Sequence, residues 1–252
     1  MTTQSELTTE SSSGAALSRK ARSFVVSRQD SQTRAFTAVG ILTALPATFS
    51  FEYLGSFLSG EQPLALGGLP LAVGPFVSER LFPVFAQRII GAHRVDRPEN
   101  LESLGLSLGS SDLEILSRSE GARPVDSIRL TELPDITTGE IDLKFFVHGV
   151  RYQEHIESVL SELHIGDSIE LVRETENPFD EYATLVNAQG KTIGYVPSAL
   201  SVLISAASDF RGQVSHVNPA SFGSNLRVLI HVQGSVGPQF LWPWQVNVAP
   251  RS

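Results

Sequence analysis

The chain is a series of short apolar runs separated by Gly, Pro, Asn and Ser, and this spacing is its most restrictive feature. Runs that end so often at turn-forming residues are typical of β-strands, because a helix needs a longer uninterrupted period. The runs begin at Ser23 and continue to about residue 234, with a few helical stretches between them. The sequence therefore predicts an α+β fold in which short strands dominate.

The first half reads as a small β-meander followed by helices. Extended runs are expected at 23–26, 35–45 and 47–54, with a turn at Pro46 between the last two. Helical periodicity follows at 78–90, 97–106 and 110–119, and 126–133 reads as a closing strand. We expect residues 1–22, rich in Ser, Thr and Glu, to be a disordered tail, and 23–135 to form the first domain.

The second half, residues 141–234, has a different pattern of apolar runs. Six apolar runs of strand type alternate with two short helical stretches at 155–164 and 198–210. The turn at Ala188–Gly190 predicts a tight hairpin between two of the strands. So many strands in so short a segment predict a small closed or partly closed β-barrel with two short helices. Residues 235–252 read as a C-terminal tail.

Composition excludes several classes of protein. There is no cysteine, and the six histidines are scattered without metal-ligand spacing, so no metal site is expected. The run Gly190–Thr192 is not a phosphate loop, because Leu185 stands where such a loop needs glycine. The apolar stretch 39–54 is broken by Pro46, which argues against a membrane span. We therefore expect a cytoplasmic, non-enzymatic protein with no catalytic residue and no cofactor.

A binding surface is the remaining interpretation. Arg151 and Tyr152 are expected at the end of one strand, residues 177–180 in a turn, and Tyr195 at the end of another strand. In a barrel, an arginine placed there contacts a phosphate, and Tyr152 and Phe179 stack on the bases of single-stranded nucleic acid. The alternative is that these aromatic residues are half-buried parts of the barrel.

Three motifs in order carry a resemblance to a known family. They are G-x-R-Y at 149–152, L-V-R-E-x-x-N-P-x-D at 171–180 and G-x-x-x-G-Y-V-P at 190–197. Together they resemble the HIRAN domain, which occurs in certain fork-remodelling helicases and as a free-standing module in bacteria. The resemblance covers about residues 141–234. It implies an OB-like barrel that binds the 3′ end of single-stranded DNA.

The resemblance also implies roles for individual residues. Arg151 and Tyr152 match a pair that grips phosphate and base, and Asn177, Phe179 and Asp180 match a turn around the terminal nucleotide. The carboxylate of Asp180 is suited to accept a hydrogen bond from a free 3′ hydroxyl. Tyr195, within the third motif, completes the expected DNA-binding set. DNA repair, phage defence and toxin regulation are the contexts that this interpretation suggests.

The first half carries a fainter resemblance. Residues 36–54, the loop at 69–71 and the stretch 82–85 resemble the N-terminal subdomain of HipA-type toxin kinases. No kinase core follows them. The alternative to DNA binding is thus an antitoxin-like or protein-interaction module whose partner is a HipA-type kinase. The net charge of −8 favours this alternative. So does Ser198, since helicase-linked members of the HIRAN family tend to carry a basic residue there.

Overall fold

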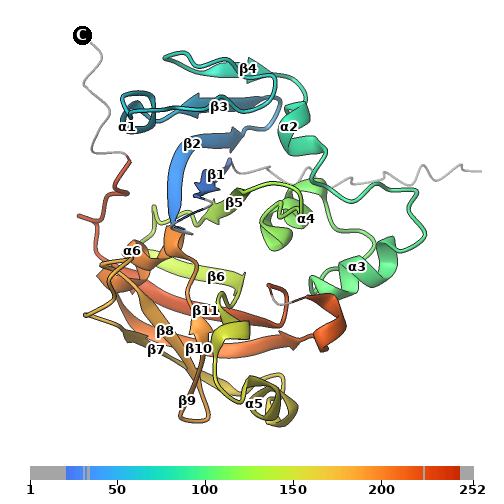
Figure 1. Cartoon of the computed structure of the whole chain (residues 1–252), viewed down its shortest axis with the longest axis vertical. Helices are drawn as coiled ribbons and strands as arrows, with labels where there is room; N and C mark the ends of the chain where they lie inside the picture. Colours follow the sequence, from blue (N-terminus) through green and yellow to red (C-terminus); the bar gives the residue numbers. More distant parts are fainter. Residues whose placement is uncertain (1–20, 31, 33–34, 224, 245–252) are drawn as a thin grey trace, which may run out of the picture.

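Two antiparallel sheets organise the part of the chain that this computed structural model describes, residues 21–244 without 31, 33–34 and 224 (Figure 1). The expected N-terminal tail lies outside the described residues except for its last two, and strand β1 already begins at Arg22. None of the described helices is long and apolar enough to cross a membrane.

The first sheet has five strands in the order β4-β3-β2-β1-β5. Successive strands from β1 to β4 are antiparallel neighbours, which makes them a meander, and β5 returns to pair with the free side of β1. The strands are β1 (Arg22–Gln29), β2 (Phe36–Ala44), β3 (Phe49–Tyr53), β4 (Phe76–Ser78) and β5 (Ile128–Leu133).

Four helices accompany this sheet: α1 (Gly55–Leu58), α2 (Pro83–Ala86), α3 (Arg97–Ser103) and α4 (Asp112–Ser119). The longest, α4, begins with a capping box, in which the Glu114 amide donates to Ser111 Oγ and the Ser111 amide donates to the Glu114 carboxylate. The helix expected at 78–90 is present only as α2, so its predicted extent is wrong. Residue 78 belongs to β4, and Pro83, which lacks an amide proton, begins a helix of a single turn.

The second sheet has six strands in the order β6-β11-β10-β7-β8-β9. They are β6 (Glu140–Phe146), β7 (Ser168–Arg173), β8 (Thr184–Ala188), β9 (Lys191–Tyr195), β10 (Ala207–Val217) and β11 (Val228–Val236). Its helices are α5 (Ile156–Glu162) and α6 (Ser198–Ala206), and two short 3-10 turns are η1 (Val150–Tyr152) and η2 (Ala220–Phe222). Positive φ at Gln189 (51°) and Gly190 (74°) forms the tight β8–β9 hairpin that the sequence predicts.

The expected OB-like barrel is not closed. Strands β6 and β9 are the outer strands of the second sheet, and no ladder joins them among the described residues. They meet only through an isolated bridge between His148 and Tyr195, just beyond the end of β6. A strand cannot continue along β9 here, because the chain turns at Gly149 (φ 69°) into η1.

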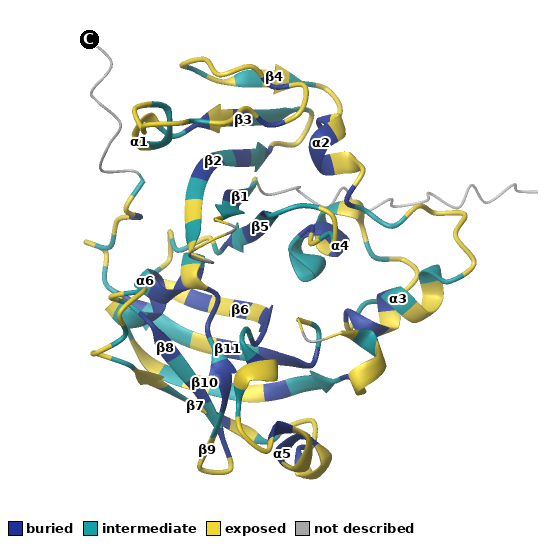
Figure 2. Ribbon diagram, viewed as in Figure 1, coloured by how far each residue is buried: buried dark blue, intermediate teal, exposed yellow. Residues whose placement is uncertain are grey.

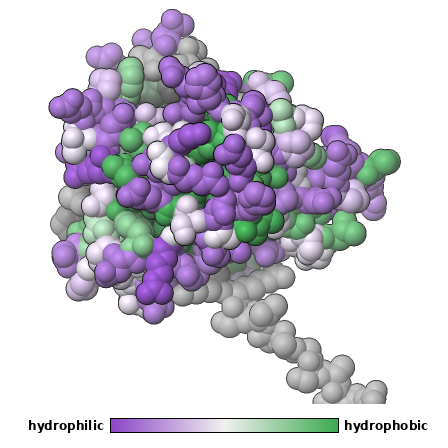
Figure 3. Space-filling model, turned by 90° about the horizontal axis from the view of Figure 1, so that it is seen from below, coloured by the Kyte–Doolittle hydropathy of each residue, from purple (hydrophilic) through white to green (hydrophobic). Residues whose placement is uncertain are grey.

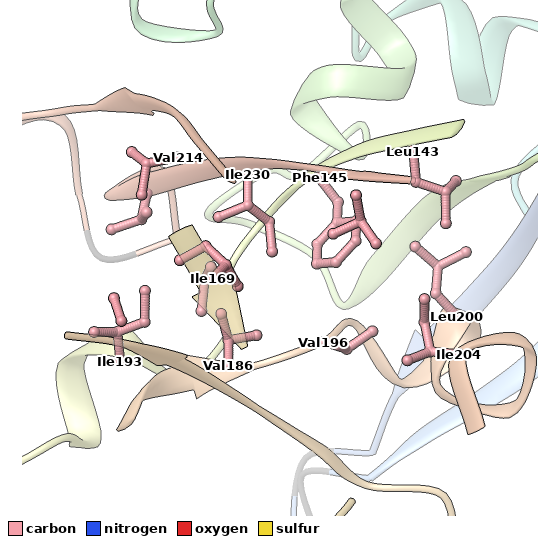
Figure 4. Close-up of a cluster of buried hydrophobic side chains, with 14 of the residues drawn as sticks. Leu143, Phe145, Ile169, Val186, Ile193, Val196, Leu200, Ile204, Val214 and Ile230 are labelled. Carbon is pink, nitrogen blue, oxygen red and sulfur yellow. The ribbon is translucent and has the colours of Figure 1, made fainter. Parts of the chain in front are cut away.

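The core of the six-stranded half is apolar and draws on every strand (Figure 4). Buried and less buried residues alternate along strands such as β8, as Figure 2 shows, so one face of the sheet points into this core. The labelled side chains come from all six strands, from α6 and from the link between β9 and α6: Leu143, Phe145, Ile169, Val186, Ile193, Val196, Leu200, Ile204, Val214 and Ile230. Val25 and Leu133 of the first sheet join the same cluster.

The residues after β11 also contribute to the core. We expected a tail from residue 235, but β11 continues to Val236 and Trp242 is only 4% exposed. Trp242 packs edge-on against Phe240 and stacks on Trp244, with ring centroids 5.2 and 5.1 Å apart. Aromatic side chains of this size are stabilised by packing against other apolar side chains, which the core of the six-stranded half provides.

Apolar and polar contacts hold the two halves together. Leu101, Leu104 and Ile115 of the first half form one cluster with Phe146 and Leu229 of the second. Beside this cluster, Asn218 Nδ2 donates to the carbonyl oxygen of Ser103 over 2.6 Å. The halves are thus one packed body rather than two units on a linker.

Candidate functional site

The bridge between His148 and Tyr195 determines which residues lie beside the end of β9. The amide of each residue donates to the carbonyl of the other, over 2.9 and 2.8 Å. A Cβ on Gly194 would lie 2.3 Å from the His148 carbonyl oxygen, so only glycine permits this approach. The bridge therefore places η1, which carries Arg151 and Tyr152, beside β9.

The sequence predicts Arg151 and Tyr152 at the end of a strand, but the structure places both on η1. Gly149 adopts a left-handed conformation that ends the extended segment and directs the next residues outward. The Arg151 guanidinium lies 4.6 Å from the centre of the Tyr152 ring and donates to its hydroxyl. Tyr152 is 69% exposed. This pair presents a cation and an aromatic face to solvent.

The turn between β7 and β8 is organised by Asn177. Its Oδ1 accepts hydrogen bonds from the amides of Phe179 and Asp180, over 2.9 and 3.0 Å. Its Nδ2 donates to Glu174 over 2.6 Å. This Asx turn holds Phe179 outward, where it is 80% exposed. One oxygen of Asp180 accepts from the Tyr182 amide over 2.9 Å.

Glu174 joins this turn to the end of β9. The Tyr195 hydroxyl hydrogen-bonds Glu174, and burial together with this carboxylate raises the pKa of Tyr195. Because Glu174 also accepts from Asn177, a continuous series of contacts runs from the turn through Tyr195 to η1. We call the surface made by η1, residues 174–183 and the end of β9 the η1–β9 surface. It contains all six residues that the sequence singled out.

Exposure separates the two interpretations of the aromatic residues. Tyr195 is half-buried, as the barrel interpretation expects, and its hydroxyl is already bonded to Glu174. Tyr152 and Phe179 are mostly exposed, so burial does not account for them. The end of the molecule where β9 and α5 lie is mostly hydrophilic, with smaller hydrophobic areas between (Figure 3). The aromatic rings of Tyr152 and Phe179 are thus available for stacking.

Sequence reasoning missed the residues that support this surface. His148 Nε2 lies 3.0 Å from a carboxylate oxygen of Glu120, at the C-terminal end of α4 in the other half. Burial opposes the charged imidazole, but the attraction of Glu120 and its hydrogen bond prevail and raise the pKa of His148. No local pattern could reveal a contact between residues 28 positions apart.

The described residues contain no group of three or more metal-ligating side chains. The η1–β9 surface instead offers a guanidinium, two aromatic faces and carboxylates. Such groups suit recognition of a flexible, aromatic and phosphate-bearing ligand.

Comparison with known proteins supports the resemblance of the second half of the chain to the HIRAN domain. Residues 141–237 match the family model of the HIRAN domain, so this segment, from β6 to the end of β11, is a HIRAN domain. The match covers less than half of the chain and does not reach the first sheet. The resemblance of the first half to HipA-type kinases therefore remains a prediction. Among curated proteins, none matches the chain.

Two solved structures resemble part of the chain. The HIRAN domain of human HLTF is 19% identical over 41% of this chain and 84% of its own length, with a TM-score of 0.31. A protein from Lactobacillus plantarum is 19% identical over 39% of this chain and all of its own length, also with a TM-score of 0.31.

Proposed function

We propose that the HIRAN domain of this chain binds single-stranded DNA at the η1–β9 surface and receives its 3′ end at the turn between β7 and β8. The observation that carries the proposal is the exposure of Tyr152 and Phe179 on one connected surface. Stacking on an exposed aromatic ring is worth about 1–3 kcal/mol per base. In this proposal the domain binds DNA and catalyses no reaction.

The six residues divide into contacting and positioning groups. Tyr152 and Phe179 stack on bases, and Arg151 contacts a phosphate. Asp180 uses one oxygen for the Tyr182 amide, so its other oxygen can accept from a 3′ hydroxyl. The Asn177 Oδ1 already accepts two amides, which makes Asn177 a positioning residue that shapes the turn. Tyr195 has the same role through its bridge to His148.

Charge limits the strength of this binding. The turn itself carries Glu174, Glu176 and Glu181, and the whole chain has a net charge of −8. Arg151 and Arg173 are the nearby cations, and Arg173 lies over the Tyr182 ring at 5.6 Å. Few phosphates can be neutralised, so the affinity should depend only weakly on salt. Specificity would come from local geometry at the strand end.

Fluorescence anisotropy with a labelled single-stranded oligonucleotide at low salt tests the proposal. Wild type should prefer a free 3′ hydroxyl over a 3′ phosphate. Tyr152→Ala and Phe179→Ala should each weaken binding about tenfold. Leu64→Ala removes a side chain of similar exposure, 64%, from the first half and is the matched control. No binding at tens of micromolar, or equal binding by all variants, would refute DNA recognition here.

A second candidate function rests on the first half. Leu64, Val73 and Val77 are 64%, 92% and 65% exposed in and beside the loop that leads to the outer strand β4. Exposed apolar side chains near a strand edge favour contact with another protein. A HipA-type kinase is the partner that the sequence suggests. If it is, the two purified proteins should co-elute in size-exclusion chromatography, and Val77→Asp should separate them.

A further inference from the structure

A second hollow lies between the two sheets, away from the η1–β9 surface. We call it the β5–β6 cleft, because β5 and β6 line it together with α4, which lies above β6 in Figure 1. Its volume is about 610 Å³, within the range of ligand-binding clefts. None of the six residues of the η1–β9 surface lines it. The cleft is therefore separate from the six residues of the proposed DNA site, although Glu120, which pairs with His148, lines it.

Arg118 of α4 is the unusual residue of this cleft. Its Nε and Nη1 atoms are buried, and neither has a hydrogen-bond partner among the described residues. Burial lowers the pKa of Arg118, although Glu132 and Glu114 nearby attract its charge. Buried donors are nearly always paired in folded proteins, so these two unpaired nitrogens indicate a missing acceptor.

The buried arginines Arg88 and Arg227 each pair with a carboxylate and also donate to a main-chain carbonyl. The Glu132 carboxylate, whose charge attracts Arg118, is already held by Arg22, over 2.6 and 2.7 Å, and by Ser117. Elsewhere, arginine side chains donate to main-chain carbonyls. Such bonds join Arg28 to Leu64 (2.8 Å), Arg88 to Val84 (2.9 Å) and to Gly121 (2.8 Å), and Arg227 to Asn218 (3.1 Å). A main-chain carbonyl would satisfy Arg118 in the same way.

The strands of the cleft favour an extended ligand. Both β5 and β6 are outer strands, so each has one side that no strand pairs among the described residues, although the Leu130 amide of β5 already donates there to the Glu120 carbonyl over 2.8 Å. An extended peptide can add to such an edge through main-chain hydrogen bonds, while its alternate side chains face the two walls. A folded surface or a globular ligand would not use these edges.

Charge decides which peptide fits. Six carboxylates and three cationic side chains line the cleft. Glu140 is exposed on β6, and Glu114 is exposed on α4. Such a lining repels polyanions, including DNA, and attracts cationic side chains. We propose that the β5–β6 cleft binds an extended basic peptide segment of a partner protein. A main-chain carbonyl of the peptide accepts a hydrogen bond from Arg118, and the Lys or Arg side chains of the peptide face Glu114 and Glu140.

The test uses the full chain and a labelled, end-blocked peptide of alternating Lys and Thr, followed by fluorescence anisotropy. Arg118→Met should weaken binding about tenfold. The exposed Arg211→Met on β10 changes the net charge equally and should leave binding unchanged or slightly stronger. Non-specific attraction to an acidic protein would strengthen in both variants, so loss in Arg118→Met alone identifies the cleft.

Two further measurements complete the test. The Glu-Thr counterpart and a Lys-Thr peptide with N-methylated alternate amides should both fail to bind, since one has the wrong charge and the other cannot join a strand edge. Arg118→Met should keep or raise the Tm, because it removes two buried donors that have no hydrogen-bond partner, whereas a structural arginine would lower it. No binding of the basic peptide at about 1 mM, tighter binding of the acidic peptide, or equal binding by Arg118→Met would overturn the proposal.

Discussion

Two regions of this molecule use an arginine in opposite ways. At the corner between α2 and β5, the Arg88 side chain is 1% exposed and forms two hydrogen bonds to the Asp126 carboxylate, at 3.0 and 2.7 Å, besides two to main-chain carbonyls. On the η1–β9 surface, Arg151 is exposed and lies over the ring of its own neighbour, Tyr152. One arginine serves the fold, and the other is presented to solvent.

The contrast shows where folding accounts for a side chain and where it does not. The six-stranded half also fixes an arginine, since Arg227 is paired with Glu157 at 2.5 Å and bonded to the Asn218 carbonyl. The exposure of Arg151, Tyr152 and Phe179 is therefore not a general property of that half. These three side chains lie on the surface where the sequence motifs meet, which is why we assign the function there.

The largest expected effect tests the contrast directly. Arg88→Met leaves the half-buried Asp126 and the Gly121 carbonyl without their partner and should lower the free energy of unfolding by about 3 kcal/mol. Arg151→Met should change it by less than about 0.5 kcal/mol, because an exposed side chain contributes little. Urea denaturation of both variants measures the difference. Equal destabilisation would mean that Arg151 also serves the fold.

The second prediction concerns the backbone that supports each region. Gly194→Ala should destabilise the chain by about 2 kcal/mol, since its Cβ would collide with the His148 carbonyl and with Val147 Cγ1 at 2.7 Å. Gly67→Ala is the control, because Gly67 is exposed and a Cβ there meets nothing within 4 Å. It should remain within about 0.5 kcal/mol of wild type.

The same pair of variants also reports on the site. Gly194→Ala should weaken the bridge to Tyr195 and with it DNA binding, measured by anisotropy below the unfolding transition. Gly67→Ala should bind like wild type. If Gly194→Ala is destabilised but binds DNA normally, the bridge belongs to the fold alone, and η1 keeps its place without it.

Local patterns predicted the strands of both halves except β4, and also the β8–β9 hairpin, because turn residues and alternating apolar residues act over short distances. The three motifs predicted six residues that one surface collects. The failures had non-local causes. The sheet stays open because the chain turns at Gly149, and Trp242 is buried because a distant core covers it. The contact between Glu120 and His148 depends on how the halves pack, which periodicity does not encode.

The smallest expected effect is the pH dependence of this contact between the halves. Glu120 raises the pKa of His148 in the folded chain, so the pair stabilises the fold fully below the ordinary histidine pKa of about 6.5. That stabilisation is lost as pH rises through the raised pKa. Wild type should therefore lose more stability than Glu120→Gln between about pH 6 and pH 8.5, measured by urea denaturation at each pH. Parallel stability profiles of wild type and Glu120→Gln would show that the Glu120–His148 pair does not link α4 to the η1–β9 surface. In that case, the first half does not support the DNA site through this pair.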